Sequence, residues 1–192
     1  MRTTLLTLLG LAATALAGPG SYCLTDSDAQ RVANNFGQTI ENYSDALADR
    51  VLTQDFTDYS DSVNELINNG CPNGPQPLGS ATFTSLADFK AGQGAQPSIP
   101  FQILNVWHNC DTVTLRWRSS NPGTVQPEQQ VTGIIVLETC FVGGQEPWLI
   151  DTVYSEFNSG AWLYDLGVFQ PTCNATSAKF FKRGISWRPN ML

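Results

Sequence analysis

The chain has 192 residues, a net charge of −7 and a hydrophobic content of 42 %. This length is typical of one globular domain with a single hydrophobic core. The excess of acidic residues argues against nucleic acid and membrane surfaces as partners, because phosphate backbones and anionic lipids would repel it. The classes of binding partner that remain are small molecules and proteins.

The first residues have the pattern of a secretory signal peptide. One basic residue, Arg2, precedes an apolar run that spans residues 5–16, and the small residues Ala15 and Ala17 form a cleavage site. We therefore expect residues 1–17 to be removed and the mature protein to be secreted into the extracellular space. No later apolar run reaches the roughly 20 residues that a membrane-spanning helix needs.

Apolar residues then recur at helical spacing. Intervals of three and four residues predict a helix over residues 27–42, with an apolar side made of Ala29, Val32, Ala33, Phe36 and Ile40. Shorter helices are predicted over residues 44–52 and 85–91. The glycines and prolines of residues 69–79 predict a loop between these two helices.

The second half of the chain has the pattern of a sheet. Residues rich in Val, Ile, Thr, Trp and Tyr predict strands over 101–108, 112–119, 129–141 and 148–158, separated by short turns. Long consecutive strands with short connections form an antiparallel meander. The predicted fold class is therefore α+β, with the N-terminal helices packed in the concavity of a curved antiparallel sheet.

The tail, residues 171–192, is unusually basic for this chain. It contains four of the nine basic residues that remain after the leader is removed. We interpret it as a solvated terminal segment, and a docking strip for an acidic partner is the alternative.

Five cysteines follow the leader, in a compartment that favours disulfides. If residues 112–119 and 129–141 form a hairpin, the numbers of opposed residues sum to about 250, so Cys110 faces Cys140 at a distance suited to a disulfide. We predict this bond, and we predict Cys23–Cys71 as a second bond that ties the first helix to the loop after the helical block. Cys173 either replaces Cys71 as the partner of Cys23 or stays free.

Two asparagines fit the acceptor pattern for N-glycosylation. They are Asn42, at the end of the first predicted helix, and Asn174, in the tail. We expect no metal site, because the chain has no C-x-x-C motif and one histidine, and we expect no cofactor.

Two segments near the C-terminus carry a resemblance to a known family. The segments TVYSEFNS (152–159) and AWLYDLG (161–167), with VLTQDFTDYS (51–60) and LRWR (115–118), are similar to small secreted fungal proteins of the nuclear transport factor 2-like superfamily. The resemblance covers about residues 23–170, and we assign a domain of this type to residues 18–170. It implies a cone of curved sheet around helices, and a fungal origin.

The same superfamily includes scytalone dehydratase, ketosteroid isomerase and polyketide cyclases, as well as members with an apolar pocket and no known chemistry. Scytalone dehydratase relies on paired histidines, whereas this chain has only His108. The base and oxyanion pair of an isomerase cannot be aligned residue by residue. The resemblance therefore implies the fold and assigns no catalytic role.

The junction between helices and sheet holds the first candidate site, made of Asp55, Asp58 and Tyr59. A carboxylate and a phenol at a cavity mouth could act as base and proton donor if burial raised the pKa of the carboxyl group. The alternative is a solvated acidic loop with turn-forming aspartates.

The last predicted strand holds the second candidate site. Tyr154, Glu156 and Asn158 share one face of this strand, and Arg116 could face Glu156 across strands. These residues form either a polar cluster at the bottom of a pocket or contacts that fix the strand register.

Two tryptophans complete the candidate binding residues. Trp107 and Trp117 lie on predicted strands and supply either pocket wall or core. The weak catalytic candidates are thus Asp55, Tyr59 and Glu156, and the candidate ligand contacts are Trp107, Arg116, Trp117, Tyr154 and Asn158.

We expect a secreted binding module that takes an apolar small molecule or a partner protein. The alternative is a cofactor-free lyase or isomerase that uses acid–base residues in the cone pocket. Two dissimilar acids in a dry pocket would favour the enzyme, whereas a cone filled by Phe, Trp and Leu side chains with no void would favour an interaction module. A homodimer through the exposed sheet face is left open.

Overall fold

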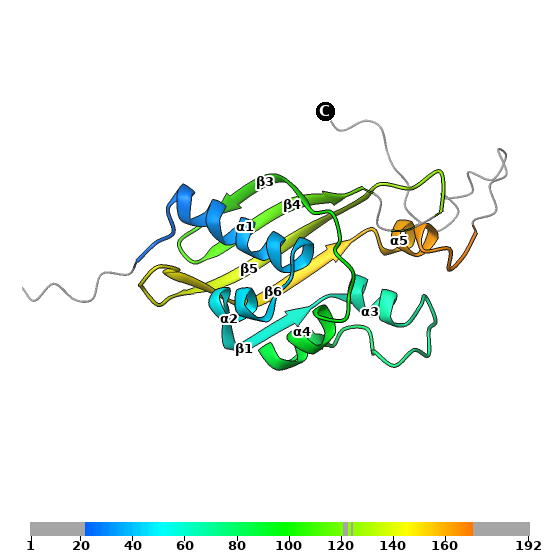
Figure 1. Cartoon of the computed structure of the whole chain (residues 1–192), viewed down its shortest axis with the longest axis horizontal. Helices are drawn as coiled ribbons and strands as arrows, with labels where there is room; N and C mark the ends of the chain where they lie inside the picture. Colours follow the sequence, from blue (N-terminus) through cyan, green and yellow to red (C-terminus); the bar gives the residue numbers. More distant parts are fainter. Residues whose placement is uncertain (1–21, 121–122, 124, 171–192) are drawn as a thin grey trace, which may run out of the picture.

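The computed structural model describes residues 22–120, 123 and 125–170, which form five helices and a six-stranded sheet in the order β2-β1-β6-β5-β4-β3 (Figure 1). In chain order the elements are α1 (Asp26–Glu41), α2 (Asp45–Val51), β1 (Leu52–Tyr59), α3 (Asp61–Ile67), β2 (Ala81–Phe83), α4 (Leu86–Gln93), β3 (Gln102–His108), β4 (Thr112–Ser119), β5 (Val131–Phe141), β6 (Trp148–Phe157) and α5 (Ser159–Asp165). Helices α1, α2 and α4 lie against one face of the sheet, and α3 and α5 lie together at one end of it. The predicted α+β fold class is confirmed.

The predicted meander is also confirmed. Strands β3, β4, β5 and β6 pair antiparallel in sequence order. The hairpin of β4 and β5 has the predicted register, since Thr112 faces Glu138 and Ser119 faces Val131. Alternation of apolar and polar residues was sufficient here because each strand is long and its neighbour in the sheet is its neighbour in sequence.

The prediction that the whole sheet is antiparallel is wrong, because β1 pairs parallel with β6. We expected residues 51–60 to link the helices to the sheet, and they form a strand instead. The polar residues Thr53, Gln54 and Asp55 interrupt the apolar alternation of this segment and hide its strand character. The apolar periodicity also predicts neither α3 nor α5, although it predicts α2, which has the same length of seven residues.

Helix α1 begins where Thr25 caps it. The Thr25 hydroxyl accepts a hydrogen bond from the N–H of Asp28 at 3.2 Å, and the Asp28 carboxylate accepts one from the N–H of Thr25 at 3.2 Å. This reciprocal arrangement is a capping box, which satisfies two backbone donors that the first turn leaves free. The contact with Thr25, and then that with Arg31, lowers the pKa of Asp28.

We expect Thr25→Ala to lower the free energy of unfolding by about 1 kcal/mol, because the variant loses the cap. Urea denaturation followed by circular dichroism measures this loss. Thr25→Ser keeps the hydroxyl and should unfold at the wild-type midpoint. Equal midpoints for the alanine and serine variants would show that the capping box does not stabilise α1.

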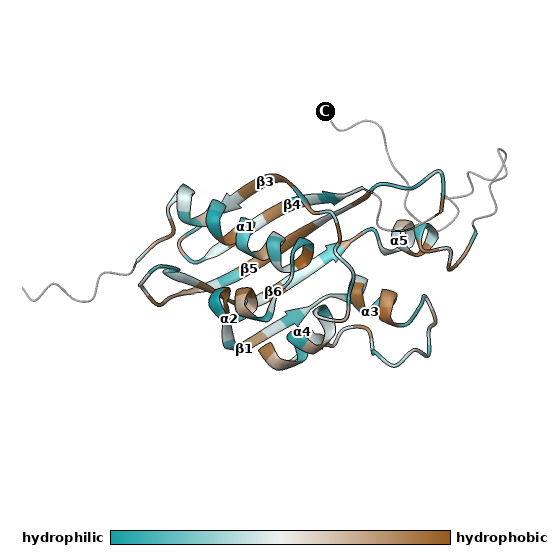
Figure 2. Ribbon diagram, in the orientation of Figure 1, coloured by the Kyte–Doolittle hydropathy of each residue, from teal (hydrophilic) through white to brown (hydrophobic). Residues whose placement is uncertain are grey.

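The core lies between the helices and the inner face of the sheet, and aromatic rings fill much of it. Phe56 on β1 packs edge-on against Phe89 on α4, with ring centroids 5.1 Å apart. Trp117 on β4 stacks on Phe101 at 4.7 Å and meets Trp162 of α5 edge-on at 6.4 Å. Figure 2 shows hydrophobic residues on the central strands behind α1. The concavity of the sheet is therefore occupied by side chains of the chain itself.

The disulfide found in the described part of the chain joins Cys23 to Cys110, so the predicted bonds Cys110–Cys140 and Cys23–Cys71 are both wrong. The predicted register extends beyond β4 to Asp111, whose carbonyl accepts a hydrogen bond from the N–H of Thr139 at 2.8 Å. Cys110 lies in the turn before β4, and its carbonyl accepts a hydrogen bond from the N–H of Leu24 at 2.9 Å. Cys110 therefore lies next to the start of α1, and its sulfur bonds to Cys23 rather than to Cys140. Cys71 and Cys140 have no disulfide partner among the described residues, and Cys173 lies outside them.

The predicted signal peptide, the tail and its Asn174 also lie outside the described residues. Within the described part, no helix has both the length and the apolar character needed to cross a bilayer.

Candidate functional site

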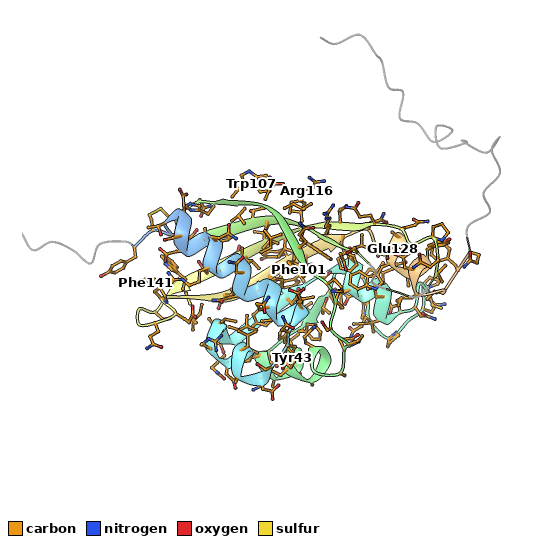
Figure 3. The ribbon with its side chains drawn as sticks, turned by 45° about the horizontal axis from the view of Figure 1, so that its top comes forward. Tyr43, Phe101, Trp107, Arg116, Glu128 and Phe141 are labelled. Carbon is orange, nitrogen blue, oxygen red and sulfur yellow. A yellow bond between two sulfur atoms is a disulfide. The ribbon has the colours of Figure 1, made fainter. Side chains whose placement is uncertain are left out.

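Five of the predicted site residues lie on the face of the sheet that turns away from the helices. They are Tyr59, Trp107, Arg116, Tyr154 and Glu156. All five are exposed, while their strand neighbours Asp58, Trp117, Val153 and Ser155 are buried beneath the helices. Because successive side chains of a strand point to opposite faces, this alternation places the five on the outer face. Figure 3 shows Trp107 and Arg116 projecting on the side away from α1.

The register of the sheet sets aromatic residues of this face in one line. Trp107 lies opposite Thr114, Thr114 opposite Val136, Val136 opposite Tyr154, and Tyr154 beside Tyr59. We call these five residues the outer-face row. The rings of Tyr59 and Tyr154 stack with centroids 5.4 Å apart. Between 41 % and 52 % of each aromatic residue in the row is exposed, so the row presents apolar surface to solvent across five strands.

A second line of residues lies beside the first. Arg116 on β4 is opposite Ile134 on β5, and Ile134 is opposite Glu156 on β6. We call these three the charged row. Ile134 separates the two charges, so the cross-strand contact between Arg116 and Glu156 that we considered does not form. No carboxylate of the described residues lies within ion-pair distance of Arg116.

Glu156 has a structural partner in helix α3. Its carboxylate accepts hydrogen bonds from the N–H groups of Asp61 at 3.0 Å and Ser62 at 3.1 Å, and from the Ser62 hydroxyl. These contacts satisfy backbone donors at the start of α3. Glu156 is therefore a fixed, exposed negative charge at the end of β6.

The remaining predicted site residues lie apart from one another. Asp55 is exposed on β1, and Trp117 is buried on the inner face, against Phe101. Asn158 follows the end of β6 and caps α5, since its side chain accepts a hydrogen bond from the N–H of Ala161 at 3.1 Å. The predicted residues therefore do not converge on one pocket.

Asp58 is one of two acidic residues that are buried in the described part of the chain, and the other is Asp165. Asp58 is 5 % exposed, and its Oδ1 atom has no hydrogen-bond partner in the described part of the chain. Burial, and then the charge of Glu156, raises the pKa of Asp58 to about 7. Had residues 52–59 been interpreted as a strand, alternation from Phe56 would have placed Asp58 on the inner face and Asp55 and Tyr59 on the outer one.

Two of the hollows at the surface of the described residues lie beside α1. The first, of about 370 Å³, lies between the ends of α1 and α4, and Asn42 is one of its lining residues. The second, of about 410 Å³, lies between α1 and β3, and we call it the α1–β3 groove. Its lining residues are Asn34, Gly37, Gln38, Phe101, Gln102 and Ile103.

The α1–β3 groove combines an apolar wall with amides. Phe101 and Ile103 supply apolar surface, and Figure 3 shows Phe101 beside α1. Gly37 allows α1 to approach this wall, because a Cβ atom there would lie only 3.0 Å from the Phe101 ring. The amides of Asn34, Gln38 and Gln102 lie around it. None of the predicted catalytic or ligand residues lines either hollow.

Neither hollow has the donor set of a metal centre. Among the described residues, no group of three or more His, Cys, Asp and Glu side chains could hold a metal ion.

Comparison with known proteins gives a family match. The sequence matches the NTF2-like domain family over residues 22–169. Comparison with curated proteins found no match.

Solved structures with a similar fold share little sequence with this chain. A candidate polyketide cyclase from Bacillus cereus is 15 % identical with a TM-score of 0.52, over 77 % of this chain and 87 % of that one. A loop-truncated variant of IdmH is 10 % identical with a TM-score of 0.51, over 72 % of this chain and 99 % of that one; wild-type IdmH is described as a candidate polyketide cyclase from Streptomyces antibioticus. At these identities the likeness extends to the fold alone.

Proposed function

We propose, from the premise that the chain belongs to the NTF2-like domain family, that it is a secreted, non-catalytic binding module for an apolar small molecule. The α1–β3 groove is the proposed binding site. The observation that carries this proposal is the combination, in one groove of about 410 Å³, of a Phe101–Ile103 wall with three amide side chains. Ligand sites of proteins commonly have this volume and this mixture of apolar lining with a few polar groups.

The chemistry of the groove indicates the kind of ligand. The flat ring of Phe101 is held from behind by Trp117, with the two planes 15° apart. A planar apolar molecule can pack against the part of this ring that lines the groove. Since the groove lining carries no charged side chain, amide hydrogen bonds to a hydroxyl or carbonyl group would orient an uncharged ligand.

The uncharged dye Nile red tests this site. We expect its fluorescence to rise when it binds the secreted protein, and we expect Asn34→Trp to weaken binding at least about tenfold, which is 1.4 kcal/mol, because the indole fills the groove. Gln54→Trp adds the same side chain on β1, at an exposed position outside the groove lining, and should bind the dye as the wild type does. Equal loss in both variants, or no binding by the wild type, would contradict the proposal.

The second candidate function is a cofactor-free lyase or isomerase, and one observation favours it. Asp58 is a buried carboxyl group with an unpartnered oxygen and a pKa of about 7, which suits a general base near neutral pH. Such a base would exchange the α-protons of a cyclic ketone with deuterium in D2O, and NMR measures this exchange. Deuterium exchange that the wild type catalyses and that Asp58→Asn does not catalyse supports the lyase or isomerase function. Exchange at the uncatalysed rate with the wild type excludes α-proton abstraction from that class of ketone.

A further inference from the structure

We infer that Cys71 and Cys173 form a second disulfide, which ties the C-terminal tail to the end of the molecule where α3 and α5 meet. This inference goes beyond the proposed ligand site beside α1, and it shares with the proposed function the expectation that the chain is secreted. It is carried by the position of Cys71, by the course of the chain after α5 and by the location of Cys140.

The first step is that Cys71 presents a fixed and accessible thiol just after α3. The N–H of Gly70 donates to the Glu65 carbonyl at 3.0 Å, which closes the last turn of the helix. The N–H of Cys71 donates to the Asn68 carbonyl at 2.9 Å, which holds the backbone at the cysteine. Cys71 is exposed and has no disulfide partner among the described residues, so its thiol is open to a partner from outside them.

The second step is that α5 brings the chain that leads to the tail next to Cys71. Helices α3 and α5 are in contact, and a Cβ atom on Gly70 would lie 3.4 Å from the Cδ1 atom of Leu163 in α5. The carbonyl of Leu163 accepts a hydrogen bond from the N–H of Val168 at 2.9 Å, because the chain folds back on the end of α5 at Gly167, which has a φ of 76°. Leu163 therefore contacts both the residue before Cys71 and the segment before the tail.

The third step is the distance that the chain can span. Cys173 lies outside the described residues, five positions after Val168. Five residues in an extended conformation span at most about 18 Å. A disulfide requires the two Cα atoms to approach to about 4.4–6.8 Å. Because the two segments share Leu163 as a contact, residues 169–172 are long enough to bring Cys173 to the exposed thiol of Cys71.

The fourth step excludes Cys140 as the partner of either cysteine. Helix α5 follows the end of β6, where Phe157 faces Gly133 of β5. Cys140 lies seven residues further along β5, which is roughly 24 Å at the rise of an antiparallel strand. Figure 1 shows this separation, since the turn that joins β5 to β6 lies at the opposite end of the sheet from α3 and α5. The distance exceeds the reach of the chain from Val168 to Cys173.

The bond forms by thiol–disulfide exchange with a disulfide oxidoreductase of the secretory pathway. The S–H bonds of Cys71 and Cys173 break, one S–S bond forms between the two sulfurs, and the disulfide of the oxidoreductase takes up both hydrogen atoms and becomes a dithiol. Of the five cysteines, Cys140 then keeps its thiol. The bond also tethers to the α3–α5 end the four basic residues that follow it, which are Lys179, Lys182, Arg183 and Arg188.

The number of free thiols in the full-length protein, collected from a secretory host, tests the inference. Alkylation of the unfolded but unreduced protein should label one cysteine. Mass spectrometry of proteolytic fragments should find this label on Cys140 and should find a peptide with Cys71 linked to a peptide with Cys173.

The bond between Cys23 and Cys110 is the internal standard, because it forms only if the protein has passed through an oxidising compartment. Its absence would overturn the secreted location and this inference together. Three labelled thiols beside an intact standard would overturn this inference alone, and so would a bond from Cys140 to Cys71 or Cys173.

Cys173→Ala and Cys140→Ala are a matched pair of variants. Removal of Cys173 frees Cys71, so the number of labelled thiols should rise from one to two, whereas Cys140→Ala should have none. Cys71→Ala and Cys173→Ala should lower the urea midpoint by the same amount, and the double variant should unfold at the midpoint of either single variant, because each change breaks the same bond. Two losses that add would mean that the cysteines act separately and would overturn the inference.

Discussion

Asp58→Asn raises the free energy of unfolding at pH 7.5 and lowers it by about 1 kcal/mol at pH 4, where only the cost of burying the amide remains. The pKa of Asp58 is about 7 in the folded protein, against an ordinary value of 3.8. Between these two values the folded state holds a proton that the unfolded state has released. Stability from this group is therefore fully present below pH 4 and is lost as the pH rises through 7.

The pKa shift of Asp58 sets the size of the change in the free energy of unfolding. A change of about three pKa units corresponds to about 4 kcal/mol at a pH above both values. The side-chain amide of the variant is buried without hydrogen-bond partners, and this cost offsets about 1–2 kcal/mol of the gain. We expect a net gain of about 2–3 kcal/mol at pH 7.5, measured by urea denaturation of both proteins across this pH range.

Asp55→Asn is the control for this experiment. Asp55 lies on the same strand, three residues earlier, and is exposed. The same chemical change at this exposed position should alter the free energy of unfolding at pH 7.5 by no more than about 0.5 kcal/mol. A pH-independent difference between Asp58→Asn and the wild type would show that Asp58 has the same charge in the folded and unfolded states.

A carboxyl group that destabilises its own fold at neutral pH is an expected feature of functional sites, where activity and stability oppose each other. The stability experiment and the exchange experiment are therefore informative together. Stabilisation with loss of proton exchange supports the enzyme. Stabilisation without any exchange leaves Asp58 as an internal acid of a binding protein.

The sequence was most informative where contacts are local. The hairpin of β4 and β5 could be predicted with its register, because the short turn and the alternation of residues fix which side chains face each other. Helix α1 could be predicted within one residue at each end from its apolar spacing and its N-cap. Each of these elements carries its signal within its own residues.

The sequence was least informative where distant segments meet. The parallel pairing of Tyr59 with Tyr154 joins residues far apart in the chain, and no local pattern encodes it. Without β1 in the sheet, neither the outer-face row nor the inward position of Asp58 can be derived. The candidate site residues stay a prediction, and the position of Tyr59 beside Tyr154 on the open face depended on this one strand.

Replacing both Cys23 and Cys110 by alanine should lower the free energy of unfolding by about 4–5 kcal/mol. The disulfide closes a loop of 87 residues, and the entropy that such a crosslink removes from the unfolded chain has this size. The bond also fixes the start of α1 beside the turn between β3 and β4, where the N–H of Leu24 and the side chain of His108 make further contacts with the other segment.

Thermal and urea unfolding with and without a reducing agent measure this contribution. The wild type should lose stability when reduced and then resemble the reduced double variant. Cys140→Ala changes a cysteine that forms no disulfide within the described residues, and on oxidised protein it should retain most of the wild-type stability. A large loss in Cys140→Ala and none in Cys23→Ala would show that Cys110 pairs with Cys140. The start of α1 would then be held by its capping box, by the hydrogen bond from the Leu24 N–H to the Cys110 carbonyl and by the contact between His108 and Asp26.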